Sequence, residues 1–314
     1  MSFSGNVKEE LARNIVKARH CQIAQIAGIL SYLGNIKEVS SEVQIELETE
    51  NVTLAKVYYE LVKKAFSVGP MIAVKRNSYL NKSRVYSVRI VEKKKKSQML
   101  KALKVEVGSG GEIDVKNWVV SDLLLQKSCC KRAFIRGVFL ATGSITDPEK
   151  GYHFEVVCNQ EKKAEQLVEQ LAFFGIEAKT TTRKNHLVVY IKEGAQIVDA
   201  LNVMEAHNAL MELENIRILK EVRNSVNRKV NCETANINKT VNAAVKQIED
   251  IELIKERMGL DELSPALLQV AELRLMYPEA PLKDLGEMLN PPVGKSGVNH
   301  RLRKLSEIAK ELRG

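Results

Sequence analysis

The residues best suited to chemistry lie near the C-terminal end, in the sequence KSGVNHRLRK (295–304). Asparagine and arginine form paired hydrogen bonds with the major-groove edges of adenine and guanine. A lysine beside the start of a helix, together with the free N–H groups there, suits a phosphate. Ser296 has the simpler interpretation of a helix cap, and His300 that of an exposed surface residue. We expect these residues to contact DNA: Lys295, Ser296, Gly297, Asn299, His300, Arg301, Arg303 and Lys304.

Three short helices are predicted to position these residues. Ser264-Pro265 is typical of a helix start, and a second helix follows Pro281 until Asn290-Pro291-Pro292 interrupts it. The third helix is predicted over about 297–312 with Ser296 as its N-cap. Its apolar residues are predicted to pack inward on the second helix: Val298, Leu302, Leu305 and Ala309 against Leu282, Leu285 and Leu289. The pattern predicts a helix-turn-helix; some of these bind only protein, but a basic third helix favours DNA.

The charge of the chain is concentrated in two stretches. The 314 residues carry a net charge of +9, and residues 75–104 hold eleven basic residues against Glu92 alone. A second excess lies in residues 295–314. Such stretches indicate a polyanionic partner, most simply double-stranded DNA, although the run Lys93 to Lys96 is equally typical of a solvated face. We expect secondary DNA contacts from the predicted strand–turn–strand at 70–92: Lys75, Arg76, Lys82 and Arg84.

The first two thirds of the chain contain an internal repeat. IAQIAGILSYLGNI (23–36) matches RAFIRGVFLATGSI (132–145), which places Gly28 and Gly34 opposite Gly137 and Gly143 at an offset of 109 residues. Each copy is predicted to contain a helix, a strand, a helix, two strands and a closing helix. The first glycine of each copy lets two helix backbones approach closely, and the second is expected to end its helix as a C′ residue. A repeat of this length indicates a duplicated domain.

These two motifs resemble those of LAGLIDADG homing endonucleases. The resemblance implies two paired helices, two saddle-shaped sheets that lie on DNA, and an acidic Mg²⁺ ligand near the end of each helix. At the matching positions this sequence has Leu33 and Thr142, and the earlier acidic position is Ser31 or Leu140. Neither leucine nor threonine holds a hard cation as a carboxylate does. We expect a retained fold without catalytic residues; a residual nuclease that uses Asp147 is the alternative.

A long amphipathic helix is predicted to follow the repeat. Apolar residues recur at three- and four-residue steps from Ile237 to Met258, and Gly259 is a good stop. Upstream, the sequence RNSVNRKVNCE (223–233) is rich in asparagine and arginine. Arg223 and Arg228 are either further phosphate or base contacts, or residues that cap helices at a domain junction.

The cysteines and histidines do not form a known motif. Five cysteines without a CxxC pair and five scattered histidines predict packing or surface residues, a reducing cytoplasm, and neither a metal site nor a cofactor. No apolar run approaches the roughly 18 residues of a membrane span, and the first residues do not resemble a secretion signal. We expect no contact with a membrane.

The combination of a degenerate LAGLIDADG repeat and a helix-turn-helix resembles the WhiA family of bacterial DNA-binding regulators. Three long stretches carry the resemblance: KSCCKRAFIRGVFLATGSITDPEKGYHFEV, RNSVNRKVNCETANINKTVNAAVKQ and LKDLGEMLNPPVGKSGVNHRLRKL. It implies a transcription factor or chromosome-associated protein on the nucleoid. The family is linked to sporulation in sporulating actinobacteria and to cell division and chromosome segregation in Firmicutes. The lysine-rich composition fits the second group better.

The expected fold is α+β, a duplicated LAGLIDADG-type saddle domain followed by an all-α helix-turn-helix domain. The predicted divisions are the first repeat at 1–108, the second at 109–206, a linker with the long helix at 207–260, and the DNA-binding domain at 261–314. The predicted function is sequence-specific DNA binding without cleavage. An adaptor whose repeat domain binds a protein partner is an alternative that is compatible with it.

Overall fold

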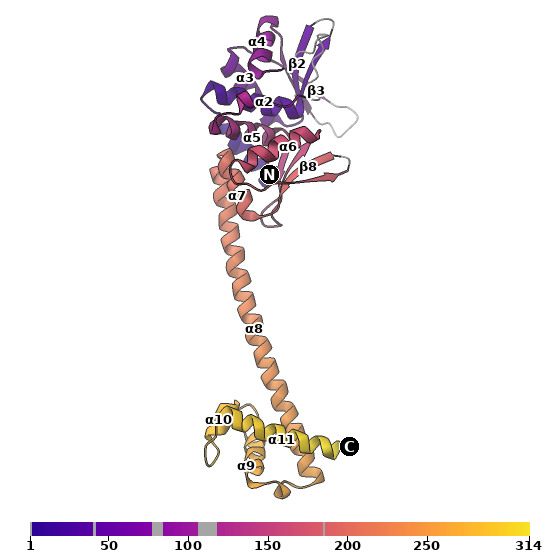
Figure 1. Cartoon of the computed structure of the whole chain (residues 1–314), viewed down its shortest axis with the longest axis vertical. Coiled ribbons are helices and arrows are strands. Elements are labelled where there is room, and N and C mark those ends of the chain that lie inside the picture. Colours follow the sequence, from indigo (N-terminus) through magenta and orange to yellow (C-terminus); the bar gives the residue numbers. More distant parts are fainter. Residues whose placement is uncertain (1, 40–41, 77–83, 106–117, 185) are drawn as a thin grey trace. The chain divides into compact units, whose positions relative to one another are not determined.

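A computed structural model describes residues 2–39, 42–76, 84–105, 118–184 and 186–314 (Figure 1). The chain divides into two compact units, Met1–Lys220 and Glu221–Gly314. The first unit contains two four-stranded antiparallel sheets with helices, and the second is helical. The α+β fold predicted from the sequence is confirmed.

The first repeat builds one sheet and the helices that cover it. In chain order it contains α1 (Phe3–Arg13), α2 (Arg19–Leu33), β1 (Gly34–Val39), β2 (Glu42–Thr49), α3 (Val52–Phe66), β3 (Met71–Arg76), β4 (Arg84–Ile90) and α4 (Lys93–Leu103). The strand order is β1-β2-β4-β3. Alternate residues such as Ile45, Leu47 and Val88 are buried beneath the helices, which is the period of two expected for a half-buried sheet.

The second repeat has the same order of elements and the same sheet topology. It contains a 3₁₀ turn η1 (Asp122–Leu124), α5 (Ser128–Thr142), β5 (Gly143–Ile145), β6 (Phe154–Cys158), α6 (Glu161–Ala172), β7 (Lys179–Arg183), β8 (His186–Ile191) and α7 (Gly194–Met204), with strand order β5-β6-β8-β7. The predicted duplication is confirmed. The prediction missed one strand in each copy, because β1 and β5 begin directly at the glycine that ends the preceding helix.

Two glycines bring α2 and α5 into close contact at the centre of the first unit. A Cβ atom on Gly28 would lie 2.7 Å from the carbonyl oxygen of Phe134, and one on Gly137 would lie 2.3 Å from that of Gln25. Both distances are shorter than any real Cβ contact, so the helix backbones touch only because these residues lack side chains. The predicted role of both glycines is confirmed.

Gly34 and Gly143 do not act as left-handed C′ residues. Their backbones are extended, with φ values of −72° and −81°. Each forms the turn from a helix directly into a strand, where a Cβ atom would lie 2.5 Å from the Leu30 side chain or 2.3 Å from that of Phe139. Close packing on the last helical turn therefore explains these glycines, and the C′ prediction is wrong.

The helix α8 (His207–Arg257) begins in the first unit and ends in the second. Gly259, with φ +85°, follows its end as predicted. Within the second unit Ile251 and Ile254 are buried, whereas Ile237, Val241 and Val245 are about half exposed. The predicted apolar stripe therefore packs only over its last turns. No helix in the part of the chain that the structure describes is long and apolar enough to cross a membrane.

The second unit is completed by η2 (Leu260–Glu262), α9 (Pro265–Met276), α10 (Leu282–Glu287) and α11 (Lys295–Arg313). Its core contains the four predicted inward residues of α11, and Leu285 and Leu289 are buried with them. Leu282 packs against this core from its edge. The predicted third helix and its inward face are confirmed, although the helix starts two residues earlier.

Candidate nucleic-acid interface

The exposed side of α11 carries the polar residues expected to contact DNA. Lys295, Ser296, Asn299, His300, Arg303 and Lys304 are exposed, and Gly297 and Arg301 are intermediate. The opposite side of the helix holds Val298, Leu302, Leu305 and Ala309 at 2% exposure or less. Packing through these four residues fixes which side of α11 faces outward, because a helix repeats every 3.6 residues. The packing therefore fixes a row of hydrogen-bonding side chains on the outer face.

Ser296 does not cap the helix. Gly294 is the N-cap residue, without a side-chain hydrogen bond, and Ser296 is the second residue of α11. Its hydroxyl and the first-turn N–H groups lie beside Lys295 at the positive end of the helix dipole. This arrangement suits a phosphate oxygen.

A groove of about 870 Å³ opens beside the start of α11 within the second unit. Its walls come from α8 and from the connection between α9 and α10, and Lys295 and Asn299 line it. Two further lysines, Lys239 of α8 and Lys283 of α10, line the same groove. Lys239 could not be predicted as part of this site, because it lies more than fifty residues before α11 and only folding brings it to this groove.

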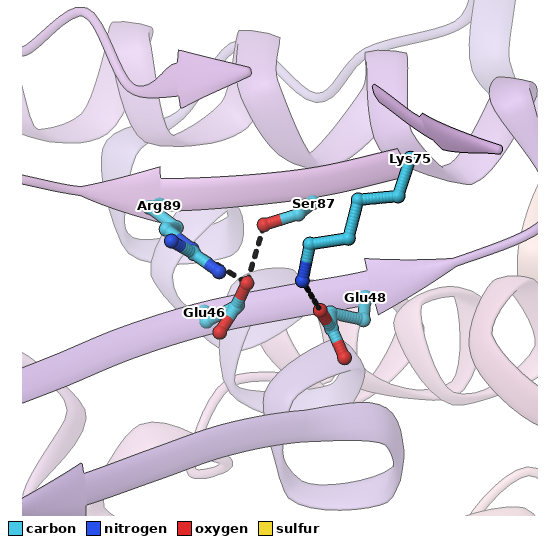
Figure 2. Close-up of polar contacts among 5 residues, drawn as sticks. All are labelled: Glu46, Glu48, Lys75, Ser87 and Arg89. Carbon is cyan, nitrogen blue, oxygen red and sulfur yellow. Dashed lines mark hydrogen bonds and ion pairs between the residues drawn. The ribbon is translucent and has the colours of Figure 1, made fainter. Parts of the chain in front are cut away.

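The outer face of the first sheet is less basic than its sequence suggests (Figure 2). Arg89 of β4 donates from Nε to Glu46 of β2 at 2.6 Å, and the Ser87 hydroxyl donates to the same carboxylate. Lys75 of β3 lies 3.3 Å from the Glu48 carboxylate. Burial raises the pKa of Glu46, but the hydrogen bonds from Ser87 and Arg89 outweigh it and leave that pKa below the ordinary value. The centre of this face is therefore a set of paired charges.

At the outer end of the β3–β4 hairpin, in contrast to the centre of the face, two arginines face each other. Arg76 and Arg84 are both exposed and lie directly opposite each other across the two strands. Two like charges at facing positions destabilise a strand pair, and an anion between them would relieve that repulsion. Lys82 lies outside the described residues. Six of the eleven basic residues of 75–104 belong to α4 or follow it directly, so only part of this stretch lies on the sheet.

The second sheet also carries a glutamate with several partners. Glu155 of β6 accepts a hydrogen bond from Ser144 at 3.1 Å, lies 3.1 Å from His153 Nε2, and pairs with Arg183 of β7 at 3.7 Å. The three partners come from β5, from the residue before β6 and from β7, which are three different parts of the sheet. Basic residues on this face are therefore also partly neutralised.

Arg223 and Arg228 lie within α8 and not at a helix end. Both are exposed, and Arg228 donates from Nε to the Asn224 carbonyl oxygen at 3.3 Å one turn earlier. The suggestion that these residues cap helices at a junction is wrong, because α8 continues for many residues on either side.

Comparison with known proteins identifies the family. A model of the WhiA N-terminal LAGLIDADG-like domain matches residues 19–105, one of the WhiA LAGLIDADG-like domain matches residues 131–223, and one of the WhiA C-terminal HTH domain matches residues 226–309. The chain belongs to the WhiA family.

Its WhiA relatives match over their full length. A probable cell division protein WhiA from Lachnoclostridium phytofermentans is 50% identical over 100% of both chains. One from Thermoanaerobacter pseudethanolicus is 45% identical over 100% of this chain and 98% of the relative. The crystal structure of full-length WhiA from Thermatoga maritima matches with a TM-score of 0.61 and 26% identity over 99% of each chain.

In this WhiA protein the ends of the two motif helices carry no carboxylate. Leu33 is the last residue of α2, and Thr142 is the last residue of α5. Near the end of α2 the buried Lys163 of α6 donates from Nζ to the Ser31 carbonyl oxygen at 2.6 Å. The Lys163 amino group therefore lies close to the end of α2, where the resemblance to nucleases implies a metal ligand.

Asp147, the acid suggested for a residual nuclease, has a structural role in this WhiA protein. Its Oδ1 accepts from the Glu149 N–H at 3.0 Å, and its carbonyl oxygen accepts from the N–H groups of Lys150 and Gly151 at 2.9 and 3.2 Å. Aspartate commonly bonds the backbone two residues ahead in this way to form a turn. These contacts explain Asp147 without any role in catalysis.

Four histidine and cysteine residues that are distant in the sequence lie close together in the structure. The donor atoms of His20, Cys21, Cys129 and Cys130 all lie within 4.8 Å of one another, at the starts of α2 and α5. We call these four residues the His-Cys cluster. The histidines and cysteines were expected to be separate packing or surface residues, and this expectation does not hold for these four. A signal was present in the sequence, because His20-Cys21 and Cys129-Cys130 are separated by the repeat offset of 109.

Proposed function

We propose that this WhiA protein binds specific DNA sequences through α11 and does not cut them. The observation that carries the proposal is the row of exposed side chains on α11, opposite a buried apolar row. Asn299 and Arg303 lie one turn apart on the outer side and match the edges of adenine and guanine. Lys295, Ser296 and Lys239 are the residues that we propose to contact the phosphate backbone. This is supported by Lys295 and Lys239 lining one groove, and by the exposure of Ser296 in the first turn of α11.

We infer the absence of cleavage from the ends of α2 and α5. Two-metal hydrolysis needs carboxylates that hold hard cations at the scissile phosphate. Leu33 and Thr142 offer none, and the Lys163 side chain donates to the Ser31 carbonyl oxygen near the end of α2. An amine donor at this place offers no ligand oxygen to Mg²⁺.

The biological role that we propose is regulation of cell division and chromosome segregation, on the nucleoid in the cytoplasm. It is supported by the relatives, which are named probable cell division proteins. The functional modules that we propose remain residues 1–108, 109–206, 207–260 and 261–314. Arg76 and Arg84 are proposed as secondary phosphate contacts, with Arg223 and Arg228 on α8.

A protein partner for the repeat domain is a second candidate. The paired charges at the centre of both sheets reduce the positive charge that faces outward there, and β3 exposes Met71, Ile72 and Val74 at an open sheet edge. Exposed apolar side chains at a sheet edge are typical of a surface that another chain covers.

Arg303→Ala tests the reading of DNA by α11. We expect the variant to lose about 1–3 kcal/mol of discrimination between its specific site and random DNA. Lys310→Ala is the matched control, since it removes one exposed positive charge from the same helix about two turns further along. Equal losses by Arg303→Ala on both DNAs would show that Arg303 contacts only the backbone.

A further inference from the structure

The His-Cys cluster lies where the two repeats meet at the start of their central helices. Two of the cysteines contact the same histidine atom. His20 Nδ1 lies 3.2 Å from Cys130 Sγ and 3.3 Å from Cys21 Sγ. Cys21 and Cys130 are buried, whereas His20 and Cys129 are exposed. One side of the cluster is therefore closed by protein, and the other is open for a ligand to enter.

The cluster follows the pseudo-symmetry of the duplicated domain. His20 and Cys21 are the second and third residues of α2, and Cys129 and Cys130 are the second and third residues of α5. The close packing at Gly28 and Gly137 holds these two helices together about two turns further along. Each repeat thus supplies two donor atoms at matching positions, so that the complete set exists only when both repeats are folded against each other.

The charges around the cluster suit an anionic centre. Neither α2 nor α5 has a side-chain N-cap, and the first turns of both helices, which the structure describes in full, contain no acidic residue. Arg19 and Lys127 stand at the two helix starts. Helix N-termini and basic neighbours favour negative charge. Burial nevertheless raises the pKa of Cys21 to about 12 and that of Cys130 above its ordinary value, so these thiolates form only together with a bound ion. A centre with three thiolates, one neutral imidazole and a divalent ion has a net charge of −1 and fits this environment.

We propose that the His-Cys cluster binds one structural zinc ion. Three sulfur donors and one imidazole nitrogen match the Cys₃His set that zinc takes in closed tetrahedral sites. Zinc–sulfur bonds of about 2.3 Å place the sulfur atoms of a tetrahedron about 3.8 Å apart. The donor atoms now lie within 4.8 Å of one another, so small side-chain rotations would bring them to this spacing around a single ion.

A zinc ion at this position would link the first repeat to the second. Binding displaces the thiol protons to solvent, and the ion then bonds to α2 and α5 at once. The ion acts on the junction of the two halves and is independent of the DNA-binding surface on α11. Failure of the zinc proposal therefore leaves the proposed function intact.

The test is the metal content of the purified, reduced full-length protein. We expect one zinc ion per chain, and we expect replacement by Co²⁺ to give the thiolate-to-cobalt charge-transfer band of a tetrahedral sulfur-rich site. His20→Ala and Cys129→Ser change exposed side chains, so both variants should fold. Each is expected to weaken zinc binding at least about tenfold in competition with a chelator.

Cys232→Ser is the matched control, because Cys232 is an exposed cysteine on α8 outside the cluster. It should keep full zinc content and the cobalt spectrum. Folded full-length protein that takes up neither zinc nor Co²⁺ would overturn the proposal. So would zinc content that survives in the His20→Ala/Cys129→Ser double variant, or oxidation of the cluster to a disulfide in protein that binds no metal.

Discussion

Glu46 and Glu155 occupy the same position in the two halves of the duplicated domain, 109 residues apart, on the second strand of each sheet. Each accepts a hydrogen bond from a serine and pairs with an arginine. The serines and arginines come from different strands in the two halves, so the same arrangement is reached with different residues. On both sheets a carboxylate therefore neutralises part of the positive charge on the outer face.

Glu46→Gln tests the pairing through the pH dependence of stability. The pKa of Glu46 lies below its ordinary value in the folded protein, so its contribution to stability is present above the unfolded pKa of about 4.3 and is lost as the pH falls through the folded pKa. We expect Glu46→Gln to lower the free energy of unfolding by about 1 kcal/mol at neutral pH, since Arg89 is 43% exposed. The difference from wild type should shrink at acidic pH in denaturant titrations.

Glu48→Gln is the control for this prediction. Its ion pair with Lys75 is exposed on both sides, so the change in stability should stay within about 0.5 kcal/mol. A Glu46→Gln variant as stable as Glu48→Gln, at neutral as at acidic pH, would contradict the importance of the Glu46 contacts.

Arg76 and Arg84 are expected to contribute to the salt dependence of DNA binding. Replacing both with alanine should reduce the slope of log K against log salt by about 2, because each lost phosphate contact changes it by about 0.9. Lys75→Ala should leave the slope nearly unchanged, since Lys75 is already paired with Glu48. An unchanged slope in the double variant would show that this hairpin does not contact DNA and would favour a protein partner for the sheet.

Gly137→Ala is expected to destabilise the first unit. Its new Cβ atom would lie 2.3 Å from the Gln25 carbonyl oxygen, a backbone atom that moves only if α2 and α5 separate. We expect a loss of about 1–3 kcal/mol in thermal or denaturant unfolding of the full chain. Gly69→Ala is the control, because a Cβ atom there meets no atom within 4 Å. Equal stability of the two variants would contradict the close approach of the helices.

The repeat and the helix-turn-helix could be predicted from the sequence because their signals are local. Gly28 and Gly137 recur at one offset, and Val298 and Leu302 follow the helical period. The start of α11 could not be fixed in the same way. Ser296 is a good capping residue by type, but Gly294 takes the cap and Ser296 lies within the helix.

The features of the site that the sequence did not reveal depend on register and packing. Glu46 meets Arg89 only because β2 and β4 pair in one particular register. The basic stretch also looked uniform along the chain, yet the fold assigns Lys75 to a strand and Lys93 to the start of a helix. The His-Cys cluster forms only when α2 and α5 pack together, since its two halves lie more than a hundred residues apart.

The most direct test of DNA binding without cleavage uses sheared genomic DNA, full-length protein and Mg²⁺ at physiological salt. The captured fragments and their ends are sequenced, with Arg303→Ala as the matched control. We predict a shared site among fragments that have random ends, with its enrichment lost in Arg303→Ala. Fragments that end at one common position near the site would show that the protein cuts DNA despite Leu33 and Thr142, and equal capture of all sequences would show that α11 does not read bases.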